Sequence, residues 1–253
     1  MDARITSRHD DWGCIRIKQI IERRGRTTRG RWRIVRTPAV LTLYGNLDSG
    51  NVYKVRLVMA QLGIRHRRVE VHQVRGEPMS PAFRAINPTG KVPTLRFEDG
   101  AILSESGAIL YYLSQGRPLW PKRAWEQAEV LKWMFFEQYS HEPYIAVNRY
   151  LLRFAGVGES EAARIAANAV KGAHALAVME AHLSDHDWLA AGAYTIADIA
   201  LYAYTHVADE GGFDLGAYPA IGGWLARVRA QPGHITLMEE TSAEPVVGLE
   251  AAS

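Results

Sequence analysis

A serine and an asparagine stand between a short apolar run and a helical pattern, in the segment Asp48-Ser49-Gly50-Asn51-Val52. Both residue types are favoured at helix N-caps, which is a structural explanation for them. A helix start also offers free backbone N–H groups and a partial positive charge, which stabilise an anion and lower the pKa of a nearby thiol. The Ser49 hydroxyl and the Asn51 amide are therefore candidates to donate hydrogen bonds to a thiolate.

A proline interrupts a second segment, Lys91-Val92-Pro93-Thr94-Leu95, which is otherwise typical of a strand. Because proline lacks an N–H donor it belongs at a sheet edge, and the chain before it is free to pair with an extended peptide. The bond before Pro93 is either cis, as a built-in feature of the backbone, or the trans bond of an ordinary edge proline.

Glu105 and Ser106 precede a third helical run, which ends near Leu113. Such residues cap helices, and they also suit the head group of an amino acid. The Glu105 carboxylate can pair with an ammonium, while the Ser106 hydroxyl and the helix N–H groups can hold a carboxylate. A thiol site, a peptide edge and an amino-acid clamp thus follow one another within one small region.

The elements that must position these groups have the order βαβαββα. Strand patterns are predicted over 40–44, 68–74, 92–97 and 101–103, and helices over 52–62, 81–86 and 104–113. After a breaker-rich stretch the strand signals stop, and helices are predicted over 123–142, 159–184, 195–208 and 218–231. The predicted fold class is therefore α/β followed by all-α, in two domains.

We expect five parts along the chain: a basic, disordered leader over 1–38, an α/β domain over 39–116, a linker over 117–122, an all-α domain over 123–240 and a loose tail over 241–253. An amphipathic anchor and a nucleic-acid arm remain alternatives for the leader.

Charge and cysteine content narrow the function classes. The first 40 residues contain 11 Lys and Arg against 4 Asp and Glu, whereas the rest contains 19 against 23, so the folded part is not expected to bind nucleic acid. No apolar run is long enough for a membrane span, and no secretory signal is visible. Cys14 is the only cysteine, which fits a reducing cytoplasm and means that thiol chemistry needs a borrowed thiol.

The three groups together resemble the glutathione transferase family over roughly Leu41 to Ile235. The resemblance rests on the stretches LYGNLDSGNVYKVRL, NPTGKVPTL, EDGAILSESGAILYYL, YTIADIALYAYTH and YPAIGGWLARVRAQPG. It implies a thioredoxin-like N-terminal domain, an all-helical C-terminal domain, glutathione as co-substrate and a homodimer. Thr195 and Asp198, in the fourth stretch, are expected to support folding rather than chemistry.

The resemblance also implies roles for individual residues. Ser49 falls where serine-type transferases carry their thiol-activating hydroxyl, and the Ser49/Asn51 pair is similar to the Thr/Asn pair of bacterial nu-class members. By similarity Val92 binds the cysteinyl backbone, Pro93 is cis, Glu105 and Ser106 bind the γ-glutamyl group, and Lys91 reaches the glycine carboxylate. Tyr44 is a rival for thiol activation, and core packing is its better explanation.

An aromatic group in the second domain is a candidate lining for the site of a hydrophobic electrophile, chiefly Tyr139, His141 and Tyr144, although interdomain core packing is an equal alternative. Glu137 and Glu142 have no partner pattern for acid–base work, and the histidines have no ligand spacing, so no metal is expected.

We expect an enzyme of detoxification that conjugates the glutathione thiolate to a small hydrophobic electrophile. A glutathione-dependent disulfide reductase or peroxidase, with a disulfide as the second substrate, is an alternative. A non-enzymatic relative that binds a protein partner is another, and the intact Ser49, Glu105 and Ser106 argue against it.

Overall fold

A five-stranded sheet in the order β4-β3-β1-β2-β5 organises the first domain. The structure is a computed structural model that describes residues 40–155 and 159–252, so the predicted leader and Cys14 lie outside the described residues. The strands are β1 (Leu41–Tyr44), β2 (His66–Glu70), β3 (Thr94–Arg96), β4 (Ile102–Ser104) and β5 (Val247–Gly248). β1 lies parallel to β2 and antiparallel to β3, which puts β1 in the centre, where successive side chains are buried on both faces.

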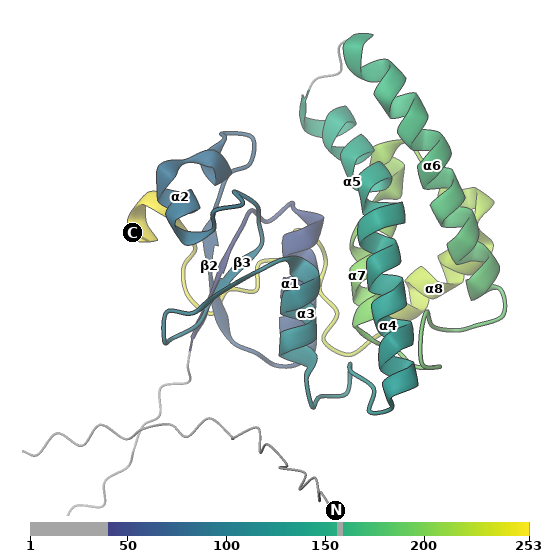
Figure 1. Cartoon of the computed structure of the whole chain (residues 1–253), viewed down its shortest axis with the longest axis horizontal. Coiled ribbons are helices and arrows are strands. Elements are labelled where there is room, and N and C mark those ends of the chain that lie inside the picture. Colours follow the sequence, from purple (N-terminus) through teal and green to yellow (C-terminus); the bar gives the residue numbers. More distant parts are fainter. Residues whose placement is uncertain (1–39, 156–158, 253) are drawn as a thin grey trace, which may run out of the picture. The chain divides into compact units, whose positions relative to one another are not determined.

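Three helices cover this sheet: α1 (Gly50–Gln61), α2 (Pro81–Ile86) and α3 (Ser106–Ser114). α1 and α3 pack together on one side of the sheet, and α2 lies on the other (Figure 1). α1 ends before Gly63, whose φ of +63° is the left-handed conformation that glycine adopts without strain. The predicted βαβαββα order is confirmed.

The second domain is helical, as predicted. Its helices are α4 (Ala124–Phe136), α5 (Glu142–Tyr150), α6 (Glu159–Leu183), α7 (Ile196–Thr205) and α8 (Pro219–Arg229), with π-helical turns at Glu137–His141 and Leu151–Ala155. Short 3₁₀ turns lie at Glu77–Met79, Ala208–Gly211, Leu215–Ala217 and Leu249–Ala252. Every residue of α7 is buried, and no described helix is long and apolar enough to cross a membrane.

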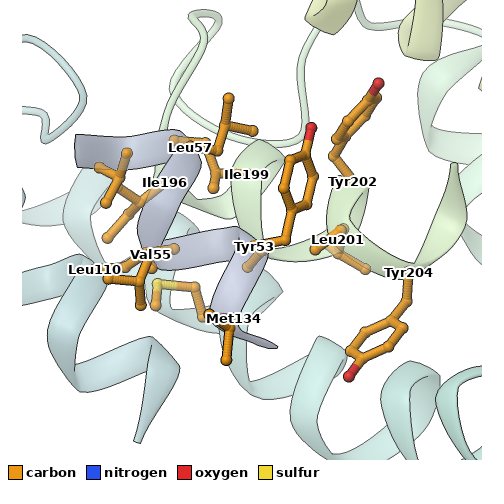
Figure 2. Packing of buried hydrophobic residues seen from close by; sticks show 14 of the residues in the cluster. Tyr53, Val55, Leu57, Leu110, Met134, Ile196, Ile199, Leu201, Tyr202 and Tyr204 are labelled. Carbon is orange, nitrogen blue, oxygen red and sulfur yellow. The ribbon is translucent and has the colours of Figure 1, made fainter. Parts of the chain in front are cut away.

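The two domains share one hydrophobic core. α7 packs against α1 and α4, and Figure 2 shows side chains of α1 such as Val55 and Leu57 beside Ile196 and Ile199 of α7. Met134 of α4 and Leu110 of α3 complete this layer (Figure 2). α1 is therefore packed against both domains.

Three predicted segments differ from the structure. β2 spans His66–Glu70 instead of 68–74, because pairing with β1 from Leu41–His66 to Tyr44–Val69 decides its register. The third helix begins at Ser106 instead of Ser104, which belongs to β4. The helix predicted to end at 142 instead continues into α5, through a π-helical turn that accommodates Pro143.

The tail predicted to be loose after 240 is tied to the sheet. The Ala243 N–H donates to the His66 carbonyl at 2.7 Å, and β5 adds a short parallel strand beside β2. Arg68 pairs with Glu240 at 2.7 Å. The tail thereby satisfies backbone groups along the outer edge of β2, which would otherwise be open.

Candidate functional site

Ser49 caps α1 and lines a cavity of about 490 Å³. Its Oγ accepts a hydrogen bond from the Val52 N–H at 3.4 Å, and only 7% of the residue is exposed. The structural interpretation of Ser49 as an N-cap is thus confirmed. Accepting this bond leaves the hydroxyl hydrogen of Ser49 available for an acceptor in the cavity.

α1 starts directly against the ring of Tyr204 from α7. A Cβ on Gly50 would lie 2.5 Å from Tyr204 Cε1, so only glycine allows this approach. Burial raises the pKa of Tyr204, which keeps its hydroxyl neutral. Tyr204 therefore forms an uncharged wall of the cavity beside Ser49.

The Asn51 amide is bonded on three sides. Its Oδ1 accepts from Lys54 Nζ at 2.7 Å and from Ser106 Oγ at 3.2 Å, and its Nδ2 donates to Glu142 Oε1 at 2.7 Å. An ammonium has no acceptor and a carboxylate has no donor, so these partners define which amide atom is oxygen and which is nitrogen. Asn51 also lines both the large cavity and a smaller neighbour of about 70 Å³.

Behind Asn51 lies a buried charge cluster of Lys54, Glu137 and Glu142. Lys54 Nζ lies 2.7 Å from Glu137 Oε1 and 3.3 Å from Glu142 Oε2, with side-chain exposures of 1%, 2% and 21% in that order. Gln138 Nε2 donates to both carboxylates, at 2.7 and 2.6 Å.

The cluster carries little net charge near neutral pH. Burial raises the pKa of Glu137 to about 7, against the opposing effect of Lys54. Burial alone would lower the pKa of Lys54, but the attraction of Glu137 and Glu142 outweighs burial and raises it. Burial alone would raise the pKa of Glu142, but the attraction of Lys54 outweighs burial, so Lys54 and Glu142 both stay charged.

The loop before α1 is clasped by Arg149 of α5. Arg149 Nη2 lies 2.5 Å from Asp48 Oδ1, and its Nε lies 2.6 Å from Glu210 Oε2. Arg149 Nη1 also donates to the Asp48 carbonyl at 3.0 Å. These bonds fix the residue before Ser49 against the second domain.

The peptide edge has the predicted form. The Val92–Pro93 bond is cis, as the resemblance implies. Asn87 Nδ2 donates to the Lys91 carbonyl at 2.8 Å and to Thr94 Oγ1 at 3.0 Å, which holds the loop on both sides of the proline. Within the described part of the chain no hydrogen bond involves the Val92 backbone, so both its N–H and C=O are open to a partner.

Glu105 precedes α3 in an unfavourable backbone conformation. Its φ of +69° lies in the region that side chains other than glycine avoid, and such a residue costs about 1–3 kcal/mol. The Glu105 side chain is exposed, and it lines the small cavity together with Lys91, Val92, Pro93 and Ser106. Six predicted residues, these five and Asn51, thus surround one cavity, and Ser49 lies beside Asn51 and Lys91 in the next.

The aromatic residues predicted for the electrophile do not line either cavity. Tyr139 is 83% exposed, Tyr144 packs under Lys171 Nζ at 5.1 Å from its ring centre, and His141 is fully buried. The large cavity is instead lined from α5 and the following turn by Pro143, Ala146, Val147, Tyr150, Leu151 and Phe154. These positions recur at helical spacing, so they share a face that Tyr144 does not.

His141 is a structural residue. Its Nε2 lies 2.9 Å from Thr205 Oγ1, whose own hydrogen goes to the Leu201 carbonyl, so His141 Nε2 is the donor. Burial lowers the pKa of His141 to about 3, which keeps the ring neutral.

Tyr44 packs in the core, as expected. It is 1% exposed and lies 6.3 Å from the Phe83 ring, centre to centre. Tyr44 lines neither cavity.

Sequence reasoning missed Lys54 and Arg149. A signal for Lys54 was available, since it lies one turn after Asn51 between the apolar Tyr53 and Val55, and Glu137 and Glu142 are two carboxylates without a nearby cation in the sequence. Arg149 carried no comparable signal. Among the described residues no group of His, Cys, Asp and Glu is arranged to hold a metal ion.

Known proteins resemble this chain over both domains. Family models described as the glutathione S-transferase N-terminal and C-terminal domains match residues 43–121 and 129–232. A crystal structure of a glutathione S-transferase from Pseudomonas fluorescens is 45% identical, covers 79% of this chain and all of its own, and superposes with a TM-score of 0.77.

More distant relatives bear different names. The disulfide-bond oxidoreductase YfcG of Escherichia coli is 28% identical, over 72% of this chain and 87% of its own length. The structure of Ure2p in complex with glutathione is 26% identical, covers 79% of this chain and 94% of its own, and has a TM-score of 0.70. The chain spans 66% of the length of Protein URE2 from Eremothecium gossypii, to which it is 28% identical over 77% of its own length.

Proposed function

This chain belongs to the glutathione S-transferase family, and on this premise we propose that its two adjoining cavities bind glutathione and activate the thiol. The observation that carries the proposal is the position of Asn51. It stands at the start of α1 and lines both the small cavity of Val92, Glu105 and Ser106 and the large cavity of Ser49. A thiol entering from the peptide edge would therefore meet the positive end of a helix.

The small cavity suits the γ-glutamyl and cysteinyl parts of the peptide. The open N–H and C=O of Val92 can pair with the cysteinyl backbone as an added strand does. Glu105 supplies a carboxylate for the ammonium, and Ser106 with the start of α3 receives the carboxylate. Lys91, at the border of both cavities, is in place for the glycine carboxylate.

Ser49 and Asn51 supply the donors for the thiolate. A free thiol has a pKa of about 8.5, and lowering it by about two requires roughly 2.7 kcal/mol of preference for the anion. The Ser49 hydroxyl hydrogen, the second Nδ2 hydrogen of Asn51 and the end of α1 are together sufficient, since one hydrogen bond to a charged group contributes about 1.5–3 kcal/mol.

The activated thiolate attacks an electrophile in the large cavity. Sulfur forms the new bond, and the leaving group departs with the electron pair of the bond that breaks. The apolar face of Pro143, Val147 and Phe154 with the ring of Tyr204 favours a hydrophobic, partly aromatic electrophile.

Disulfide reduction is a second candidate, favoured by the polar half of the large cavity and by the similarity to a disulfide-bond oxidoreductase. Glutathione thiolate would attack one sulfur of a disulfide, form a mixed disulfide and release the other sulfur as thiolate. A second glutathione thiolate would attack the glutathione sulfur of the mixed disulfide, giving glutathione disulfide and releasing the remaining sulfur of the substrate as a second thiolate. Asn46, Gln73 and Arg164 would meet the polar groups of such a substrate.

Calorimetry with glutathione tests binding, and parallel assays with aryl halides, peroxides and 2-hydroxyethyl disulfide separate the reactions. Absence of glutathione binding would leave a non-enzymatic, partner-binding protein as the better description.

We also propose that two copies of the chain pair. Phe135 is 66% and Tyr111 43% exposed around an apolar hollow of about 390 Å³ between α3 and α4. Sedimentation at micromolar concentration should show a dimer that Phe135→Glu weakens, and a species of single-chain mass alone would contradict the proposal.

A further inference from the structure

The hydrogen bonds around Asn51 decide which atom of its side-chain amide is left for a ligand. Thiolate stabilisation requires an N–H, and an amide turned by half a rotation would present its oxygen instead. Lys54 and Ser106 hold Oδ1, Glu142 holds one hydrogen of Nδ2, and no other bond to Nδ2 forms among the described residues. The second Nδ2 hydrogen is therefore the one left for a ligand.

Ser106 cannot be a constant partner in this arrangement. Its single hydroxyl hydrogen goes to Asn51 Oδ1 in the structure, and a bound γ-glutamyl carboxylate would compete for it. When Ser106 turns to the ligand, Lys54 Nζ remains as the donor on Asn51 Oδ1. Its 2.7 Å bond is also the shorter of the two and comes from a cation.

We propose that Lys54 is a positioning residue, which holds Asn51 Oδ1 away from the cavity so that the Asn51 N–H faces the bound thiol. The inference rests on the proposed function, because it assigns how the thiol site is kept in its donor orientation. Glu137 and Glu142 hold the ammonium in turn, and the π-helical turn Glu137–His141 brings both carboxylates to one side of the helix.

A stabilising role alone does not account for the cluster. Taking an ammonium and two carboxylates out of water is costly, and apolar side chains of similar volume would often be as stable. Lys54 and Glu142 both bond the Asn51 amide, and Glu137 bonds Lys54. This arrangement is explained if the three charges orient that amide.

Four titratable groups of the described residues face Lys54. Glu137 and His141 come from the π-helical turn, Glu142 from α5 and Tyr204 from α7. Burial keeps His141 and Tyr204 neutral, so the charges that accompany a change at Lys54 are those of the two glutamates.

The test uses the full chain and Lys54→Met with saturating glutathione. The ultraviolet absorbance of the thiolate against pH reports the pKa of the bound thiol. Calorimetry with S-methylglutathione, which has no ionisable thiol, reports the affinity for the peptide part of glutathione. We expect the thiol pKa to rise by about one, tenfold in the ionisation constant, with S-methylglutathione affinity unchanged within about twofold.

Repeating Lys54→Met in an Asn51→Ala chain separates two effects of Lys54: orientation of the Asn51 amide and direct stabilisation of the thiolate by the Lys54 charge. If Lys54 acts through the Asn51 amide, its removal should raise the thiol pKa much less when the amide is already absent. Equal rises in both backgrounds would assign Lys54 a charge effect alone and overturn the proposal. A folded Lys54→Met chain with an unchanged thiol pKa would also overturn it.

Lys54→Met leaves Glu137 buried without its cation and can unfold the chain. The variant Lys54→Met/Glu137→Met removes both charges and is expected to keep its circular dichroism and S-methylglutathione binding, with the same rise in thiol pKa. The unaltered chain separates the two hypotheses: if it binds no glutathione or does not lower the thiol pKa, the proposed function itself fails.

Discussion

Helices α1 and α7 both begin with a hydroxyl cap and a polar side chain in the first turn, but only at α7 are these polar groups fully paired within the described protein. At α7, Thr195 Oγ1 accepts from the Ala197 N–H, and Asp198 accepts from the Thr195 and Leu189 N–H groups and from Trp224 Nε1. Asp198 is fully buried, and its oxygens meet donors from three segments. This start has nothing left to offer a ligand.

The start of α1 also has a hydroxyl cap and a polar side chain, but two of their hydrogen-bond donors have no partner among the described residues. Ser49 accepts one backbone bond and keeps its hydroxyl hydrogen, and Asn51 keeps one amide hydrogen beside the cavity. Where every donor and acceptor at a helix start is paired within the protein, the hydrogen bonds stabilise the fold. Where donors are left without an acceptor, they can bind an anion. The comparison predicts that damage at α7 lowers stability and damage at α1 changes chemistry.

The largest effect is expected at Asp198. Asp198→Ala leaves buried donors of Thr195, Leu189 and Trp224 without an acceptor, and each such group costs about 1–3 kcal/mol, so urea unfolding should show a loss of about 3 kcal/mol or more. Asp198→Asn keeps one acceptor oxygen and should lose less. Folded protein should retain the thiol pKa of bound glutathione. A loss below about 1 kcal/mol would contradict the structural role.

Ser49→Ala should have the opposite profile. Loss of one hydrogen bond to the thiolate should raise the thiol pKa by about one to two, and loss of the cap should lower stability by about 1 kcal/mol. Asn51→Ala should show a smaller rise. Tyr44→Phe is the matched control, because Tyr44 is buried away from both cavities, and a clear rise there with none in Ser49→Ala would overturn the assignment.

The α1 start was predictable because its signals are local. The cap Ser49, the proline after Val92 and the pair Glu105-Ser106 each stand within a few residues of the element that they begin or end. Such signals depend on backbone geometry that neighbouring residues determine, so the element order and six residues around the small cavity follow from sequence.

The charge cluster of Lys54, Glu137 and Glu142 and the α5 residues that line the large cavity were not predictable in the same way. Lys54 meets Glu137 and Glu142 across 83 and 88 positions of the chain, and that pairing depends on how α1 packs beside the second domain. Tyr139 and His141 were predicted from their aromatic character alone, and the π-helical turn Glu137–His141 in which they lie changes the phase of the helix there, so sequence spacing does not show which face they occupy. The tail was missed because β5 has only two residues, too few for an alternating pattern.

Glu137 should make stability depend on pH. Its pKa is raised from the ordinary 4.5 to about 7 in the folded chain, so between these values the folded state binds more protons than the unfolded state. Stability relative to Glu137→Gln, which does not titrate, should therefore be highest below about pH 4.5, fall as pH rises to about 7 and stay level above. Urea unfolding of both proteins across this range measures it, and a difference that grows with pH would contradict the sign.

The smallest effect on stability is expected at Glu105, where the backbone is strained. Glu105→Gly and Glu105→Ala both remove the carboxylate, but only glycine adopts a φ of +69° without strain. Glycine should therefore be the more stable of the two by about 1 kcal/mol, whereas alanine, which carries the same backbone strain as glutamate, should be close to the unaltered chain. Both should weaken glutathione binding by about tenfold or more, because the ammonium of the γ-glutamyl group loses its charged partner. Urea unfolding of the two variants measures the backbone strain at residue 105, and calorimetry measures what the Glu105 carboxylate contributes to glutathione binding. If alanine and glycine were equally stable, the backbone at 105 would carry no strain; if both bound glutathione as well as the unaltered chain, Glu105 would not hold the ammonium.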